Sequence, residues 1–247
     1  WLMRWDGSDP QQLTTHRAIA LAPAWSPDGQ WLAFTSFLRG QPQLFVLRPT
    51  QGNFRPISTL PGVNASARFS PDGKQVAFAA GDDGHTHLWI VPAEGGTPVQ
   101  LTTARGISTQ PAWSPNGRQI VFTSTMGGSP QLYAVDAEGT NLRRLTFEDQ
   151  FADEAAWAPD GVRLAYTTQV DGRFQIATLD LRTNARAVID GPGSNESPCW
   201  SPDGTTLAFV STRTGRKQIF ITDPLGRPRQ ITADGNNTQP AWVAQVQ

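Results

Sequence analysis

The sequence predicts an all-β protein, a closed six-bladed β-propeller with four-stranded blades. Three observations lead to this fold class. An aromatic residue followed by a Ser-Pro-Asp-Gly-like turn recurs along the chain about every 42–44 residues. Each repeat contains four short strand-like stretches, and no window shows a sustained helical period. The two chain ends carry complementary parts of one further repeat.

The recurring turn marks each predicted blade. Proline fixes φ at the second position of such a turn, and glycine accepts the positive φ at its end. We therefore interpret the near identity of the turns as a requirement of geometry. The five copies run over residues 25–29, 69–73, 113–117, 157–161 and 200–204, and a sixth copy keeps only Pro240-Ala241-Trp242.

The first repeat shows the order of the four strands. Strand a ends on the aromatic Trp25, strand b alternates through Leu32-Ala33-Phe34, strand c reads Leu44-Phe45-Val46, and strand d is Ile57-Ser58. Four short strands in about 42–44 residues match the blade of a propeller.

The chain ends predict how the ring closes. Residues 1–17 carry stretches like strands c and d, whereas residues 237–247 carry a strand a. Together they are expected to form a sixth blade, so that residues 1–247 are one propeller domain of five complete repeats and one shared blade. Closure of this kind removes exposed sheet edges. Strand b of the shared blade has no source in the sequence: either that blade has three strands, or further sequence precedes Trp1.

Composition excludes several classes of partner. The formal net charge is -1, so bulk electrostatics attract neither nucleic acid nor an anionic membrane. No stretch approaches the roughly 18 apolar residues that a membrane helix needs, and no membrane insertion is expected. Cys199 is the single cysteine, which rules out a disulfide within the chain. It stands in strand a where other repeats have alanine, which favours a buried small thiol.

The connections from strand d to the next strand a vary between repeats, unlike the turns. In a propeller these connections share one face with the b-to-c connections, which we name the loop face. The a-to-b and c-to-d turns share the opposite face, the turn face. Specific binding needs asymmetry, so we predict that a protein partner docks on the loop face. Apolar Val63, Ile107 and Phe151 are expected at the centre of the interface, with polar residues as its rim. The predicted partner-binding residues are Val63, Asn64, Ile107, Ser108, Thr109, Gln110, Phe151, Asp153, Glu154, Asn195, Glu196, Thr238 and Gln239.

Three carboxylates stand on neighbouring predicted blades: Asp153, Glu154 and Glu196. Solvated acidic loops are one interpretation. The other is a subsite at the mouth of the central channel for a cation or for a partner's Lys or Arg. Oxygen ligands suit a hard cation, so calcium is the candidate ligand, and no organic cofactor is predicted.

A second cluster of titratable residues lies in one b-to-c hairpin and consists of Asp82, Asp83, His85 and His87. A His-x-His pair on a strand points to one side, but the flanking glycines favour an ordinary turn. Motifs of enzymes are missing: there is no Gly-x-Ser-x-Gly elbow, phosphate loop or His-Glu-x-x-His helix. The sequence therefore predicts a non-catalytic scaffold. Two alternatives stay open, a propeller-fold enzyme and the substrate-gating propeller of a peptidase.

Essentially the whole chain resembles the TolB β-propeller family. The likeness rests on the stretches 21–29, 109–115 and 239–242, and on Arg-x-Leu-Thr at the ends of repeats. The resemblance implies a six-bladed ring, a periplasmic place in the Tol–Pal system of the bacterial envelope, and binding of Pal, the peptidoglycan-associated lipoprotein. It also makes calcium in the channel plausible. We expect a monomer. The N-terminal α/β domain of that family is absent from this sequence.

Overall fold

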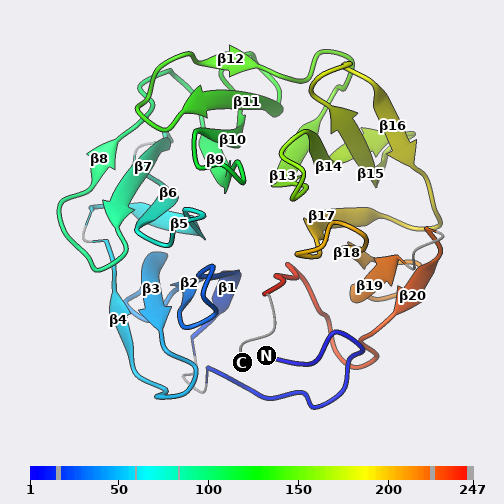
Figure 1. Ribbon diagram of the computed structural model, residues 1–247, viewed down its shortest axis with the longest axis horizontal. Helices are drawn as coiled ribbons and strands as arrows, with labels where there is room; N and C mark the ends of the chain where they lie inside the picture. The colour runs from blue at the N-terminus through cyan, green and yellow to red at the C-terminus, as the bar shows by residue number, and fades with distance from the viewer. Residues whose placement is uncertain (15–17, 59, 83, 223–225, 244–247) are drawn as a thin grey trace.

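Each of the five complete repeats folds into one four-stranded antiparallel sheet, with its strands in chain order from the centre of the ring to the rim (Figure 1). The structure, a computed structural model, describes residues 1–14, 18–58, 60–82, 84–222 and 226–243. These residues form no helix with the length and apolar character that a membrane crossing needs.

The strands follow the predicted order a to d in every blade. Blade 1 contains β1 (Ala20–Trp25), β2 (Leu32–Ser36), β3 (Gln43–Leu47) and β4 (Phe54–Pro56). Blade 2 contains β5 (Val63–Phe69), β6 (Gln75–Gly81), β7 (His87–Pro92) and β8 (Val99–Gln100). Blade 3 contains β9 (Ser108–Trp113), β10 (Gln119–Ser124), β11 (Gln131–Asp136) and β12 (Arg143–Arg144). Blade 4 contains β13 (Ala152–Trp157), β14 (Arg163–Val170), β15 (Arg173–Asp180) and β16 (Arg186–Ile189). Blade 5 contains β17 (Asn195–Trp200), β18 (Leu207–Ser211), β19 (Gln218–Thr222) and β20 (Pro228–Gln230).

The prediction of six blades is wrong, because the described residues form five four-stranded sheets. Within residues 1–14 the backbone pairing is limited to one bridge between Leu2 and Gln11, and residues 236–243 contain no strand. The physical reason is the missing strand b, since a strand a without that partner has no ladder to join. Figure 1 shows both terminal segments in the gap between blade 5 and blade 1.

Side-chain contacts nevertheless tie the terminal segments to the blades on either side of this gap. The Trp242 indole N–H donates to the carbonyl of Cys199 in blade 5 at 3.2 Å. The Gln239 side chain accepts a hydrogen bond from the Ala22 N–H of blade 1 at 2.8 Å. Leu13 packs against the apolar cluster of blade 1. The ends therefore fill the gap with irregular chain instead of a sheet.

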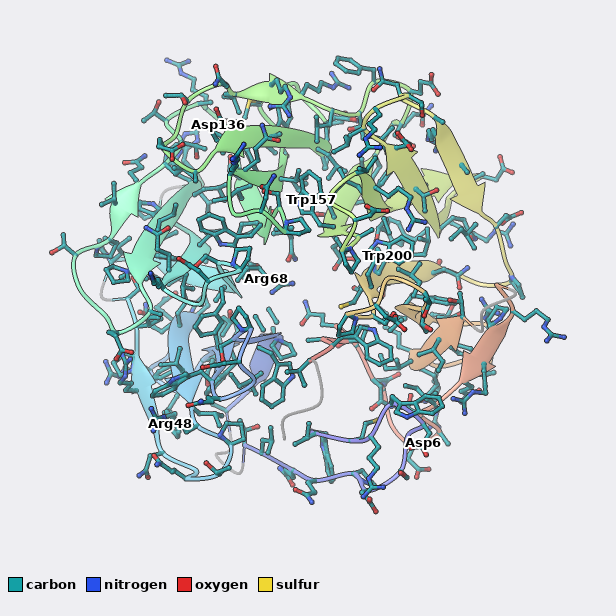
Figure 2. The ribbon with its side chains drawn as sticks, in the orientation of Figure 1. Asp6, Arg48, Arg68, Asp136, Trp157 and Trp200 are labelled. Atoms are coloured by element: carbon teal, nitrogen blue, oxygen red, sulfur yellow. The ribbon has the colours of Figure 1, made fainter. Side chains whose placement is uncertain are left out.

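The hydrophobic core lies between neighbouring blades. Successive residues of a strand point to opposite faces of its sheet. In β6, Val76 and Phe78 pack into the cluster shared with blade 1, whereas Ala77 belongs to the cluster shared with blade 3. The aromatic residues that end strand a lie on the inner side of the ring, as Figure 2 shows for Trp157 and Trp200.

The Ser-Pro-Asp-Gly turns are held by their own hydrogen bonds. The Ser70 hydroxyl donates to the Asp72 carboxylate at 2.6 Å and accepts from the Gln75 N–H at 2.9 Å. Gly73 has φ +72°, and a Cβ there would lie 3.6 Å from Pro27 in the turn of the preceding blade. Equivalent serine-to-Asp or serine-to-Asn bonds recur at Ser26, Ser114 and Ser201. Turn geometry therefore accounts for the repeated motif.

Candidate functional site

Strand a of every blade contains a β-bulge close to its start. The register of its pairing with strand b shifts there, and one non-glycine residue takes a left-handed conformation. Such a residue costs about 1–3 kcal/mol. These bulge residues are Ala22, Ser66, Gln110, Glu154 and Ser197, with φ between +51° and +59°, and Gln239 of the C-terminal segment has φ +54°. These bulge residues are thus a set of equivalent backbone positions around the ring.

The bulges link neighbouring blades. The Ser197 N–H of blade 5 donates to the Glu154 carboxylate of blade 4 at 2.9 Å, and the Ser66 N–H donates to Thr35 of blade 1 at 3.2 Å. The Ala22 N–H reaches Gln239 in the same way. The acceptor is itself a positive-φ residue in two of these three contacts, Glu154 and Gln239, and is Thr35 of strand b in the third.

Glu154 is held firmly by this arrangement. Besides the Ser197 N–H, its carboxylate accepts the Ser197 hydroxyl at 2.9 Å and the Thr167 hydroxyl at 3.0 Å. Burial raises the pKa of Glu154, and the charge of neighbouring Asp153 raises it further. Burial also raises the pKa of Asp153, whose carboxylate accepts the Glu154 N–H at 2.7 Å. Burial thus disfavours the charged form of both adjacent carboxyls.

The third predicted carboxylate is occupied elsewhere, because Glu196 forms an ion pair with Lys217. In the part of the chain that the structure describes, no group of three or more His, Cys, Asp or Glu side chains is arranged to hold a metal ion. Asp153, Glu154 and Glu196 therefore do not form a ready calcium cage, and calcium binding stays an untested prediction. In the hairpin that contains Asp82, His85 and His87, the fourth predicted residue, Asp83, lies outside the described residues.

Three predicted partner-binding residues are buried and hold their loops in place. Asn64 accepts the Ser58 hydroxyl at 2.7 Å and donates to the Leu60 carbonyl at 2.8 Å. Asn195 donates to Gln175 at 2.8 Å. The Ser108 and Ser124 hydroxyls are 3.2 Å apart. These side chains shape the loop face from within and present little of themselves to a partner.

A glutamine directly before the apolar residues of strand c recurs in four blades, and it was not among the predicted site residues. Its side-chain amide donates to a carbonyl of the following d-to-a connection in four blades, through Gln43, Gln131, Gln175 and Gln218. Blade 2 has His87 at this position, and its buried Nδ1 has no hydrogen-bond partner. The signal was visible as a polar residue directly before each apolar strand c. His87 is therefore a member of the repeat, which favours the structural interpretation of that hairpin.

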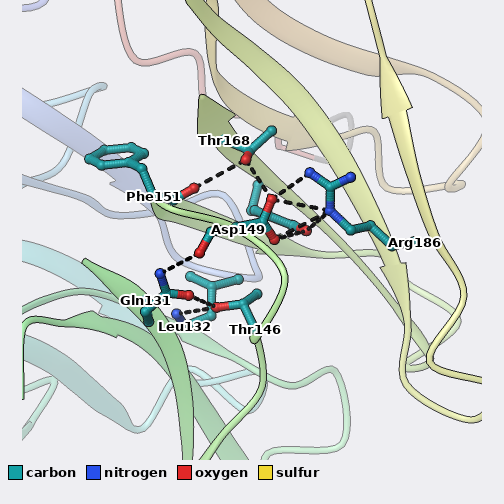
Figure 3. A network of polar contacts seen from close by, with 8 residues as sticks. Gln131, Leu132, Thr146, Asp149, Phe151, Thr168 and Arg186 are labelled. Atoms are coloured by element: carbon teal, nitrogen blue, oxygen red, sulfur yellow. Dashed lines mark hydrogen bonds and ion pairs between the residues drawn. The ribbon is translucent and has the colours of Figure 1, made fainter. Parts of the chain in front are cut away.

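Buried polar contacts position the acidic connection before blade 4 (Figure 3). Asp149 accepts the Tyr166 hydroxyl at 2.8 Å and the Thr168 hydroxyl at 2.6 Å, and it pairs with Arg186. Its carbonyl accepts the Gln131 amide at 2.9 Å. Burial, followed by the charge of Asp149, raises the pKa of Tyr166. Blade 3 and blade 4 thus hold one connection between them, and that connection leads into Phe151, Asp153 and Glu154.

Exposed apolar side chains lie at the loop-face ends of blades 1 to 3. Val63 and Ile107 are 36% and 44% exposed. Phe151 is half-buried and packs against Phe174, with ring centroids 5.3 Å apart. Blade 1 adds exposed residues that the sequence reasoning missed, and its Phe37 N–H bonds to the Ile19 carbonyl at 3.2 Å. We name the following set the apolar patch: Ile19, Leu21, Phe37, Leu38, Val63 and Ile107.

The remaining predicted residues lie at or beside the positive-φ positions. Thr109 and Gln110 are half-buried on β9, and Gln110 is the bulge residue of blade 3. Thr238 is exposed directly before Gln239. The structure thus separates the predicted set into an exposed group, a group that links blades and a buried group.

Fold and site together define a β-propeller with a varied loop face and a repetitive turn face. The model of the TolB beta propeller domain family matches residues 1–246, so the chain belongs to the TolB β-propeller family. The Tol-Pal system protein TolB of Desulfosudis oleivorans is 44% identical over 59 residues, which cover 24% of this chain and 13% of that protein. A protein TolB homolog of Chlorobium chlorochromatii is 56% identical over 41 residues, 17% of this chain and 9% of that protein.

Solved structures agree on the fold. The TolB of Acinetobacter baumannii superposes with a TM-score of 0.87 at 29% identity, covering 96% of this chain and 60% of that one. A puromycin-hydrolyzing peptidase of Mycobacterium tuberculosis reaches a TM-score of 0.68 at 16% identity, over 90% of this chain and 39% of that one. The second likeness shows the fold alone. The chain covers less than two thirds of the length of each of these relatives, at most 60%.

Proposed function

We propose that this propeller is a non-catalytic protein-binding scaffold of the Tol–Pal system that docks a partner on its loop face. The observation that carries the proposal is the apolar patch. Exposed apolar side chains from three neighbouring blades, beside polar connections, have the composition of a protein interface with a buried centre and a wet rim. The turn face lacks this asymmetry, because its turns are built from the same hydrogen bonds in four of the blades.

The partner that we propose first is a Pal-like, peptidoglycan-associated lipoprotein. The names of the TolB relatives support this choice, since they assign those proteins to the Tol-Pal system. The same proposal implies a periplasmic location. A propeller-fold enzyme is less well supported, because Glu154 and Glu196 already serve as acceptors for Ser197, Thr167 and Lys217.

The test is calorimetric titration of the full chain with a purified, delipidated Pal-like domain. We expect Ile107→Ala to weaken binding by more than about 1 kcal/mol and Leu38→Ser by about 1.4 kcal/mol, a tenfold loss, because truncating an apolar side chain at an interface centre removes its contacts.

Asp72→Ala and Asp203→Ala on the turn face are the matched controls, and both should leave the affinity unchanged. A partner that binds equally well to the Ile107 and Leu38 variants would contradict the proposed face. Absence of binding by the folded wild-type chain would contradict the proposed partner.

A further inference from the structure

Small side chains occupy one equivalent position in strand a of four blades, next to the turn face. Arg68 occupies that position in blade 2. It pairs with Ala77 across β5 and β6, directly before the aromatic Phe69. The same register holds Ala24, Ala112, Ala156 and Cys199 in the other four blades. The sequence places Ala241 at the corresponding point of the C-terminal segment. One blade therefore carries a long cationic side chain where every other copy has a small one.

The equivalence of these positions is visible in a second set of contacts. The Trp113 indole N–H donates to the Arg68 carbonyl at 3.2 Å. The Trp157 indole makes the same bond to the Ala112 carbonyl at 3.1 Å, as Trp242 does to Cys199. The backbone of Arg68 is thus fixed by the next blade. Figure 2 shows its side chain reaching from β5 toward the centre of the ring.

Arg68 forms no ion pair with any of the described residues. Its Nη1 donates to the Ala67 carbonyl at 2.8 Å, the only side-chain hydrogen bond that it makes with a described residue. No carboxylate oxygen of the described residues lies within 4.0 Å of its guanidinium. A guanidinium presents five N–H donors in a planar fork. Most of them therefore lack an acceptor among the described residues, although the side chain is half-buried.

The surroundings of Arg68 select the kind of anion. Burial lowers the pKa of Arg68, and the electrostatic influence of Cys199 and Glu154 acts against that shift. These two residues lie on blades 5 and 4, and β17 faces β5 across the ring (Figure 1). The carboxylate of Glu154 would repel a doubly charged phosphate more strongly than a singly charged group. A carboxylate also matches the guanidinium fork with two parallel hydrogen bonds.

We propose that Arg68 anchors a carboxylate-binding site at the centre of the ring. The ligand is a single carboxylate group, carried either by an acidic side chain of a protein or by a free small acid. This site does not depend on the proposed docking at the apolar patch. It lies at the end of strand a next to the turn face, and not in the connections of the loop face.

The experiment follows the Arg68 Nε–Hε resonance of the ¹⁵N-labelled full chain, assigned by its loss in Arg68→Lys. Sodium acetate is titrated against sodium chloride at matched ionic strength and neutral pH. We expect a saturable shift with acetate and none with chloride. Melting temperatures give a second measurement: acetate should raise that of the wild type and of Arg118→Ala, a matched exposed arginine variant, but not that of Arg68→Ala.

An equal shift with chloride, a larger response to inorganic phosphate, or an unchanged acetate effect in Arg68→Ala would each overturn the site. Two capped pentapeptides, Gly-Gly-Asp-Gly-Gly and its Asn counterpart, separate the two sources of the carboxylate. A shift with the Asp peptide alone supports a protein side chain as ligand. A response confined to acetate supports a free acid.

Discussion

At the scale of single residues, the bulge of strand a decides what the side chains at the centre of the ring can do. A left-handed bulge residue turns its N–H toward the preceding blade, as at Ser66 and Ser197. The side chain at the same position can then accept such a bond, as Glu154 and Gln239 do. A polar side chain at this position therefore stabilises the junction between two blades without any ligand.

The first prediction concerns the charge of Asp153. Because its folded-state pKa is raised, its contribution to stability is complete below the unfolded pKa of about 4 and is lost as pH rises through the folded pKa. We expect Asp153→Asn to be more stable than the wild type at pH 7 and no more stable near pH 4. Thermal melts at both values measure this. A constant difference between the two proteins would contradict it.

The calcium hypothesis makes a separate prediction for Asp153 and Glu154. A divalent ion would offset their crowded charge, and a ligand at 100 times its dissociation constant stabilises by about 2.7 kcal/mol. We expect a higher melting temperature in calcium than in chelator, and no such difference in Asp153→Asn. Coincident wild-type curves would leave Glu196 with its Lys217 partner and the site without calcium.

At the scale of elements, the d-to-a connections are placed by buried polar side chains. The glutamine at the start of strand c and the Asp149 network both reach these connections from neighbouring strands. Buried polar groups with all their partners make a connection rigid. The loop face is therefore a set of varied side chains on firmly held backbone.

Arg186→Ala tests this junction. The substitution leaves the buried Asp149 carboxylate without its cation, so we expect a loss of about 3–5 kcal/mol of unfolding free energy. Arg4→Ala is the control, since Arg4 and Asp9 form an exposed pair at 2.9 Å worth at most about 1 kcal/mol. Denaturant titration measures both variants. Equal losses would mean that Asp149 needs no cation.

At the scale of the whole molecule, five sheets and two irregular terminal segments make the ring. The gap between blade 5 and blade 1 is filled through Trp242, Gln239 and Leu13 rather than through a backbone ladder. Blade 1 is therefore tied to the C-terminal segment by the hydrogen bond between Ala22 and Gln239, 217 positions apart.

Deleting residues 238–247 should expose the edge of the gap. The Ala22 N–H and the Cys199 carbonyl lose their partners, and the cover that Trp242 provides disappears. We expect a loss of at least about 3 kcal/mol of unfolding free energy, measured by denaturant titration. Trp1→Ala is a control, because Trp1 is 74% exposed. A truncated chain as stable as the parent would show that the C-terminal segment contributes nothing to closure.

The repeat, the order of four strands in each blade, and the structural role of the Ser-Pro-Asp-Gly turns could all be predicted from the sequence. These features are local: alternation of apolar residues and turn chemistry act within a few residues. The family followed from the same motifs.

The number of blades, the burial of Asn64, Ser108 and Asn195, and the lack of an ion-pair partner for Arg68 among the described residues follow from the three-dimensional arrangement alone. Whether the two chain ends form a sheet depends on a strand b that no local pattern supplies. Whether a polar side chain faces a partner or its own loop depends on which strand lies beside it. Whether an arginine finds a counter-charge depends on side chains from blades far apart in the sequence, and that is set by the closure of the ring.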